Sequence, residues 1–242
     1  MTIEQNRKWW DDYAWPQDGE EWSEAWGGAW AQWHWCIRPR IAQWLPARRL
    51  VEIAFGHGRW THFLCHESEY MIGVDVSEQC AQYCRASFVN LRRNVTFRVC
   101  DGKTLPGISD SYADFAFSFD SLVHADAGVI AAYLKELARV LNPGATAFIH
   151  HSNIGTYPGA PNPGARSPDM TAALFAQFAQ EAGVPCVLQE CITWGKGPEL
   201  RDCLSTIRKG PPLRAGHPTI ADHGFMEDAQ RIKEIAPYYA TA

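Results

Sequence analysis

The sequence of 242 residues lacks several features that would assign a chain quickly to a class. No apolar run approaches the roughly 18 residues that a membrane span needs, so we expect no contact with a membrane. The first ten residues contain no signal-peptide core, which favours a cytoplasmic location. Lys and Arg total 22 against 27 Asp and Glu, and they form no basic cluster of the kind that binds phosphate backbones. Nucleic acid is therefore not an expected partner.

Paired cysteine motifs are also missing. Eight cysteines are present, but none forms Cys-x-x-Cys. Cys80 and Cys84 are one helical turn apart, and no second pair accompanies them as a structural zinc site would require. We expect reduced and mostly buried thiols.

Tryptophan, in contrast, is abundant at the beginning of the chain. Nine of the eleven tryptophans lie within the first 44 residues. Trp22, Trp26, Trp30 and Trp33 recur at helical spacing, which predicts one apolar helix face. This face either packs on the core or forms a cap whose edge binds the substrate through Trp26 and Trp30. Tryptophan rings stack well on the C–H faces of sugars, so both interpretations can hold together.

From residue 49 onward, apolar stretches of strand length alternate with helical stretches. The seven expected strands span residues 50–55, 70–76, 95–100, 113–120, 145–151, 185–194 and 201–210. This alternation predicts an α/β fold with a doubly wound, mostly parallel, Rossmann-like sheet of seven strands. A short glycine-containing loop joins the last two strands, so the last strand should be antiparallel. We divide the chain into an N-terminal Trp-rich helical cap (1–48), a central domain (49–210) and a C-terminal tail with a short helix (211–242).

The segment VEIAFGHG, residues 51–58, has the pattern of a glycine loop between a strand and a helix. Gly56 and Gly58 permit a tight turn and a close approach to a ligand. Ala54 stands where such loops usually carry their first glycine. Asp75 ends the second strand, where a carboxylate can accept hydrogen bonds from ribose hydroxyls. These features fit a cofactor that contains adenosine, but a two-glycine loop alone does not identify it.

Four further features narrow the choice of cofactor. Glu52 lies inside the first strand and Asp101-Gly102 end the third, while FDSLVH (119–124) and ELARVLNPGATAFI (136–149) flank the fourth and fifth. With the glycine loop, they resemble the class I S-adenosylmethionine-dependent methyltransferases across residues 50–209. A dinucleotide is disfavoured because the loop lacks the full Gly-x-Gly-x-x-Gly. The resemblance implies that residues 49–210 form a methyltransferase domain with S-adenosylmethionine as cofactor.

The resemblance also implies roles for individual residues. Glu52 and the backbone of Gly56 and Gly58 would hold the methionine end of the cofactor. Asp75 would bind the ribose and Asp101 the adenine, while Phe119 would line the sulfonium side. The other residues expected to bind the cofactor are Phe55, Arg59, Val76 and Gly102.

Methyl transfer to an aliphatic hydroxyl requires a base, because such a hydroxyl is a weak acid. Asp120 and His124 follow the fourth strand, and His150 and His151 close the fifth. Adjacent strand residues point to opposite faces, so one of the two neighbouring histidines can face the site while the other packs behind it. We expect His150 or His151 to remove the acceptor proton, helped by Asp120 or His124.

FSFDSLVHAD and FIHHSN, at the same two strand ends, also resemble bacterial methyltransferases that act on sugar hydroxyls. The first hypothesis is therefore an O-methyltransferase of a sugar or sugar-containing small molecule. An N-methyltransferase of an aminosugar or small amine in natural-product biosynthesis is the alternative. A non-catalytic binding protein is disfavoured because Glu52, the two loop glycines and both aspartates are intact.

Two further questions concern the acceptor side. A divalent metal held by Asp120, His150 and His151 is a competing use of those residues, as in catechol-type methyltransferases. The Pro- and Gly-rich loop 157–168 predicts a lid, with Tyr157 and Arg166 as substrate-binding residues. The expected partner is a small-molecule acceptor, and homo-oligomer formation is left open.

Overall fold

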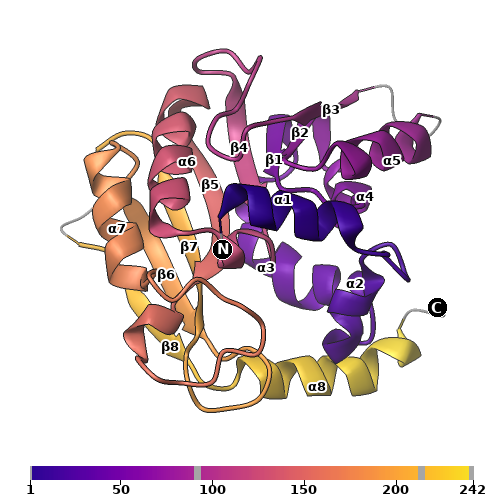
Figure 1. The fold of residues 1–242 in the computed structure, drawn as a ribbon, viewed down its shortest axis with the longest axis vertical. Helices are drawn as coiled ribbons and strands as arrows, with labels where there is room; N and C mark the ends of the chain where they lie inside the picture. The colour runs from indigo at the N-terminus through magenta and orange to yellow at the C-terminus, as the bar shows by residue number, and fades with distance from the viewer. Residues whose placement is uncertain (1, 90–93, 212–215, 240–242) are drawn as a thin grey trace.

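The computed structural model describes residues 2–89, 94–211 and 216–239, and a single eight-stranded sheet forms its centre (Figure 1). The strands are β1 (Ala47–Ile53), β2 (Ser68–Asp75), β3 (Val95–Val99), β4 (Ala113–Ser118), β5 (Leu141–Ser152), β6 (Cys186–Ile192), β7 (Asp202–Arg208) and β8 (Thr219–Asp222). Their order is β3-β2-β1-β4-β5-β7-β6-β8. β7 runs antiparallel to β5 and β6, and the other pairs are parallel. The order reverses between β1 and β4, the kind of position where doubly wound sheets bind ligands.

The eighth strand corrects the seven expected from the sequence. β8 pairs in parallel with β6, and Gln189 lies opposite Thr219. Its four residues are exposed or half-buried, with Ile220 about half exposed. A short edge strand of this kind has no buried apolar run by which the sequence could reveal it. The expected antiparallel pairing of the two strands around the Gly195 loop is confirmed by β6 and β7.

Helices cover both faces of the sheet. α6 (Ala127–Val140) and α7 (Ala172–Glu181) pack on one face, and they appear together on the left of Figure 1. The opposite face is covered by N-terminal helices, α4 (Thr61–Leu64), α5 (Glu78–Phe88) and α8 (Phe225–Ile235). Phe148 and Ile149, neighbours on β5, belong to the two different apolar clusters. Burial on both faces explains why the central strands read as continuous apolar runs.

The tryptophan-rich segment is helical but broken. Its elements are α1 (Ile3–Asp12), η1 (Glu20–Trp26), α2 (Ala29–Gln32), η2 (Trp33–Ile37), α3 (Arg38–Ile41) and η3 (Ala42–Trp44). Gly27, with φ of +85°, ends η1 and interrupts the stripe. Trp26 and Trp33 are buried in the core, whereas Trp22 and Trp30 are 39% and 41% exposed. Only part of the stripe is therefore a packing face.

The remaining short helices are η4 (Leu122–His124), η5 (Ile154–Thr156) and η6 (Ala236–Tyr238). η4 matters most for function, because it follows β4 directly and carries His124. Within the described ranges, no helix is both long and apolar enough to cross a membrane.

Candidate active site

A cavity of about 440 Å³ lies at the carboxyl ends of β1, β2 and β4. Its walls come from α1 and the segment that follows it, the glycine loop, the turn after β4, residues 163–166 and Trp194 beyond β6. In Figure 1, α1 crosses the middle of the molecule in front of the sheet. The cavity thus combines the switch point of the sheet with a cover from the N-terminal segment.

Asp75 and the glycine loop form one hydrogen-bonded unit. Asp75 Oδ2 accepts from the backbone N–H of Gly56 at 2.9 Å, and Oδ1 accepts from that of Ser77 at 2.9 Å. Burial raises the pKa of Asp75, and these amide donors oppose the rise. Gly58 has φ of +83°, and a Cβ there would lie 2.7 Å from the Phe88 ring. The loop therefore needs glycine for both conformation and space.

Ala54 adopts the conformation of the glycine that it replaces. Its φ is +61°, in the left-handed region that L-residues usually avoid. The strain is about 1–2 kcal/mol for an alanine. The loop therefore turns at this position despite the extra methyl group.

Glu52 is buried within β1, and the Thr61 hydroxyl donates to its Oε2 at 2.5 Å. Burial raises the pKa of Glu52 to about 8, and the nearby Asp75 acts in the same direction. The side chain does not line the cavity. Its expected contact with the methionine end of a cofactor stays a prediction.

At the end of β3, Gly102 lines the cavity, whereas the carboxylate of Asp101 does not. A Cβ at Gly102 would lie 2.8 Å from Ile3 of α1. Asp101 is exposed, and its Oδ1 accepts from the amides of Lys103 and Thr104 at 2.8 and 2.7 Å. Because Asp101 is turned into its own loop and lies outside the cavity wall, the expected adenine contact does not fit its side chain. The other residues predicted from the same resemblance that do line the cavity are Phe55, Gly56, Arg59, Asp75, Val76 and Phe119.

Arg59 and Asp120 form a shielded ion pair on the cavity wall. Arg59 Nη2 lies 2.9 Å from Asp120 Oδ2, and each side chain is only about a tenth exposed. Arg59 Nη1 also donates to Ser23 at 3.0 Å. Beside it, the buried Nε1 of Trp60 has no hydrogen-bond partner among the described residues. Asp120 neutralises the charge of Arg59, so the pair gives the cavity wall no free cation. The expected contact of Arg59 with the cofactor stays a prediction.

His124 is the candidate base that faces the cavity. Its Nδ1 lies 3.1 Å from the carbonyl oxygen of Ala165. A carbonyl can only accept, so Nδ1 carries the proton and Nε2 keeps its lone pair. Burial lowers the pKa of His124 below its ordinary value, and Arg166 adds to this effect. A neutral imidazole with a free lone pair on the cavity wall is suited to accept a proton.

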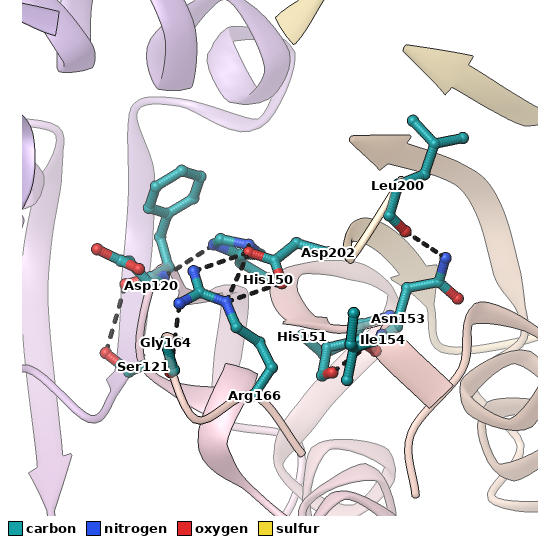
Figure 2. A network of polar contacts seen from close by, with 12 residues as sticks. Asp120, Ser121, His150, His151, Asn153, Ile154, Gly164, Arg166, Leu200 and Asp202 are labelled. Carbon is teal, nitrogen blue, oxygen red and sulfur yellow. Dashed lines mark hydrogen bonds and ion pairs between the residues drawn. The ribbon is translucent and has the colours of Figure 1, made fainter. Parts of the chain in front are cut away.

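His150 lies behind the cavity wall in a buried network, in which it and Arg166 converge on Asp202 (Figure 2). Its Nδ1 accepts from the backbone N–H of Asp120 at 3.1 Å, and its Nε2 lies 3.2 Å from Asp202 Oδ2. Burial alone would raise the pKa of Asp202, but Arg166 and His150 outweigh it and hold that pKa at about 2. The ring is fully buried behind Phe119 and does not line the cavity, although Nε2 makes no well-aligned hydrogen bond among the described residues. The prediction that His150 removes the acceptor proton does not fit this placement.

His151 points to the opposite face of β5. Its ring stacks on Phe175 of α7 with centroids 4.0 Å apart. Nε2 lies 2.8 Å from the Ser205 hydroxyl and Nδ1 lies 2.9 Å from the Ser152 carbonyl. Burial lowers the pKa of His151 to about 3. It is a core histidine with satisfied nitrogens, so the prediction of a catalytic role does not fit here either.

The predicted metal ligands are not brought together. Asp120 pairs with Arg59, His150 is buried against Asp202, and His151 lies across the sheet. Across the described ranges, no group of three His, Cys, Asp or Glu side chains is placed to hold a metal ion. The three predicted ligands therefore do not form a site.

The expected substrate-binding residues are only partly on the cavity. Arg166 lines it, but Tyr157 instead packs in the small cluster around Leu200 and Cys203. Trp26 contacts Trp194 in the core and Trp30 lies on His34 at the surface, so both are corrections to the prediction.

Other tryptophans line the cavity instead. They are Trp9, Trp10, Trp15, Trp22, Trp60 and Trp194. Trp22 is the member of the periodic stripe that lines the cavity. Periodicity could not point to the others, because Trp9 and Trp10 belong to the separate helix α1 and Trp194 lies far away in sequence. Asp202, the central anion of the buried network, had no signal beyond its place at the start of a strand.

Residues 50–144 match the family described as a methyltransferase domain. No curated protein matches the chain. Three solved structures share the fold: an S-adenosylmethionine-dependent methyltransferase from Mesorhizobium loti, another from Aquifex aeolicus, and the geranyl diphosphate C-methyltransferase from Streptomyces coelicolor A3(2) in complex with Mg²⁺, geranyl diphosphate and S-adenosyl-L-homocysteine. Their identities to this chain are 19%, 14% and 13%, with TM-scores of 0.55, 0.55 and 0.63. The alignments cover 74%, 86% and 86% of this chain and 98%, 98% and 97% of the respective structures.

Proposed function

We propose that the chain is an S-adenosylmethionine-dependent methyltransferase that methylates a hydroxyl of a neutral, ring-containing small molecule such as a sugar, with His124 as the base. The match of residues 50–144 to the methyltransferase domain supports this proposal. The observation that carries the proposal is the lone pair of His124 Nε2, which the bond from Nδ1 to Ala165 leaves free on the cavity wall. A hydroxyl acceptor needs such a base.

The cavity suits the cofactor by shape and charge. The glycine loop allows the close backbone approach that the methionine end of the cofactor needs. Asp75 forms no ion pair within the described ranges, and it supplies negative charge for a cofactor of net positive charge. When bound, S-adenosylmethionine supplies a methyl group on a positively charged sulfur.

His124 then handles the one proton that the reaction releases. Its Nε2 takes the hydroxyl proton while the acceptor oxygen bonds to the methyl carbon. The cofactor would supply the methyl group and keep the bonding electron pair on its sulfur, so the His124 imidazolium would carry the only proton to be returned to solvent. The remaining wall excludes water and holds the acceptor in line with the methyl group.

A neutral acceptor follows from the paired charges. Arg59 is neutralised by Asp120, and Arg166 is neutralised by Asp202. Neither guanidinium is left to bind a diphosphate or a carboxylate of the acceptor without breaking a shielded pair. Asp126 also lines the cavity, and it forms no ion pair within the described residues. An anionic acceptor would therefore meet net negative charge.

The aromatic wall supports a ring-containing acceptor. Trp10 and Trp22 lie with ring centroids 6.2 Å apart, and Trp10 lies 6.0 Å from His124. Indole faces next to the base can stack on a sugar ring while one of its hydroxyls reaches Nε2. The same faces favour the second candidate, an amine acceptor, because indole attracts cations.

Mass-spectrometric screening of glycosides, alcohols and amines for a gain of one methyl group tests the proposal. His124→Ala should lower kcat on a hydroxyl acceptor by about 10²–10⁴-fold. His34→Ala, which alters a histidine beside Trp30 outside the cavity, is the matched control. Methylation of amines alone, at a rate that His124→Ala leaves unchanged, would establish the second candidate and overturn the first.

A further inference from the structure

We propose that Arg166 is a positioning residue: by latching residues 162–167 to Asp202, it holds the Ala165 carbonyl that makes His124 a base. This inference rests on the proposed function. The tautomer of His124 is then set by a separate loop, through the Ala165 carbonyl, and not by the strand end that carries His124.

The latch is a two-point contact between a loop and a strand. Arg166 Nε donates to Asp202 Oδ1 at 3.1 Å, and Nη2 donates to Oδ2 at 3.0 Å (Figure 2). Asp202 is fully buried at the start of β7. A planar guanidinium bound at two points fixes direction as well as distance. The position of the loop is therefore fixed by a contact with the sheet as well as by its own turns.

The backbone around Ala165 is held on both sides. Asn162 accepts from the Arg166 N–H at 2.9 Å and donates to the Arg166 carbonyl at 2.7 Å. The Ser167 N–H donates to the Val123 carbonyl at 2.9 Å, one residue before His124. Ala165 itself has φ of +49°, an unfavourable conformation for alanine that the surrounding bonds must maintain. The position of its carbonyl thus depends on the latched loop.

The same loop forms part of the cavity wall. Residues 163–166 line the cavity, as does His124. Movement of this wall away from the acceptor would also remove the carbonyl from His124 Nδ1. The Nε2 lone pair is then no longer fixed, because the tautomer of a histidine is set by the bond that its other nitrogen makes. Closing the cavity wall over the acceptor and fixing the proton of His124 on Nδ1 therefore depend on the same loop position.

The charged groups around His124 come from several elements. Arg166 from the loop lowers its pKa, while Asp120 after β4 and Asp202 on β7 raise it. Asp126, two residues along the chain, also lines the cavity, whereas α1 presents the uncharged ring of Trp10. Loosening the latch therefore alters both the burial and the charge that act on the ring.

The test is ring ¹⁵N NMR of the full-length protein in wild type and Arg166→Lys. The lysine keeps the charge but loses the two-point geometry. We expect wild-type His124 to be protonated on Nδ1, and the variant to exchange between the two tautomers. The kcat of the variant should fall about tenfold to hundredfold, as for a displaced catalytic group, while S-adenosylmethionine affinity stays within a few-fold. Arg139→Lys is the matched control, because Arg139 is also held at two points but by Glu136, away from the cavity.

Two results separate this inference from the proposed function. An unchanged tautomer in Arg166→Lys would overturn the latch, even where His124→Ala has lost activity as expected of a base. Full activity of His124→Ala would overturn the base itself, whatever the tautomer. If Arg166→Lys does not fold, Asn162→Ala at the exposed end of the loop gives the same readout, and a fixed Nδ1–H there contradicts the proposal.

Discussion

The Ser77 hydroxyl donates a hydrogen bond of 2.6 Å to Asp11, which ties α1 to the start of α5. None of the residues of α1 is buried, yet Ile3, Asn6, Trp9 and Trp10 line the cavity. α1 is therefore a cover held by few contacts, and its main effect should be on ligands rather than on stability.

Asp11→Ala should weaken this cover. We expect the Kd for S-adenosylmethionine to rise several-fold with little change in Tm, because one part-buried hydrogen bond is worth about 1 kcal/mol. Calorimetry and thermal unfolding measure the two quantities. Asp12→Ala, on the neighbouring exposed residue, is the control. A large loss of Tm with unchanged affinity would show that α1 supports the fold instead.

Glu52 should make stability depend on pH. Its folded-state pKa of about 8 exceeds the ordinary value of 4.5, so between these values the folded protein holds a proton that the unfolded chain has released. The free energy of unfolding should therefore fall as pH rises from 5 to 8, by up to about 5 kcal/mol from this group.

Glu52→Gln should remove most of that slope. Denaturant unfolding at several pH values measures it, with Glu181→Gln at an exposed position of α7 as control. An equal slope in wild type and Glu52→Gln would mean that Glu52 is already ionised in the folded protein.

Ala54→Gly should be tolerated and slightly stabilising. Relief of the left-handed strain gains about 1–2 kcal/mol, and the greater freedom of unfolded glycine returns about 0.5–1 kcal/mol. Ala147→Gly, in buried β5, should instead destabilise. Denaturant unfolding compares the two, and a loss of stability on Ala54→Gly would contradict the strain.

His124 should set the acidic limb of the activity profile. The base must be neutral, and burial lowers its pKa below the ordinary 6.5. The kcat should therefore rise with pH through an apparent pKa below 6.5 and stay level above it. A limb near the ordinary value or higher would point to a different base.

Chelation should leave activity unchanged, because Asp120, His150 and His151 do not converge on one point. Activity with and without a strong chelator, followed by addition of Mg²⁺ or a softer ion, measures this. Loss on chelation with recovery on re-addition would return metal-assisted deprotonation to consideration.

The order of strands and helices was largely readable from the sequence, since strands buried on both faces give apolar runs of recognisable length. β8 was not, because Thr219–Asp222 is an exposed edge strand recognisable only by its pairing with β6. The tryptophan stripe predicted a helix, weakened at Gly27-Gly28, that either packs on the core or binds the substrate. The structure interrupts it at Gly27 and packs Trp26 into the core.

The sequence by itself determined the glycine loop and the place of Asp75 beside it, because loop, strand and Asp75 are close in the chain and their spacing fixes their geometry. The acceptor side was decided by tertiary structure alone. Strand alternation places His150 and His151 on opposite faces, but it cannot show that Asp202, 52 residues after His150, covers one of them. Nor can it show that the Ala165 carbonyl, 41 residues after His124, reaches that ring. Which nitrogen of a histidine is free depends on the groups within hydrogen-bonding distance of it, and in this protein those partners come from distant segments.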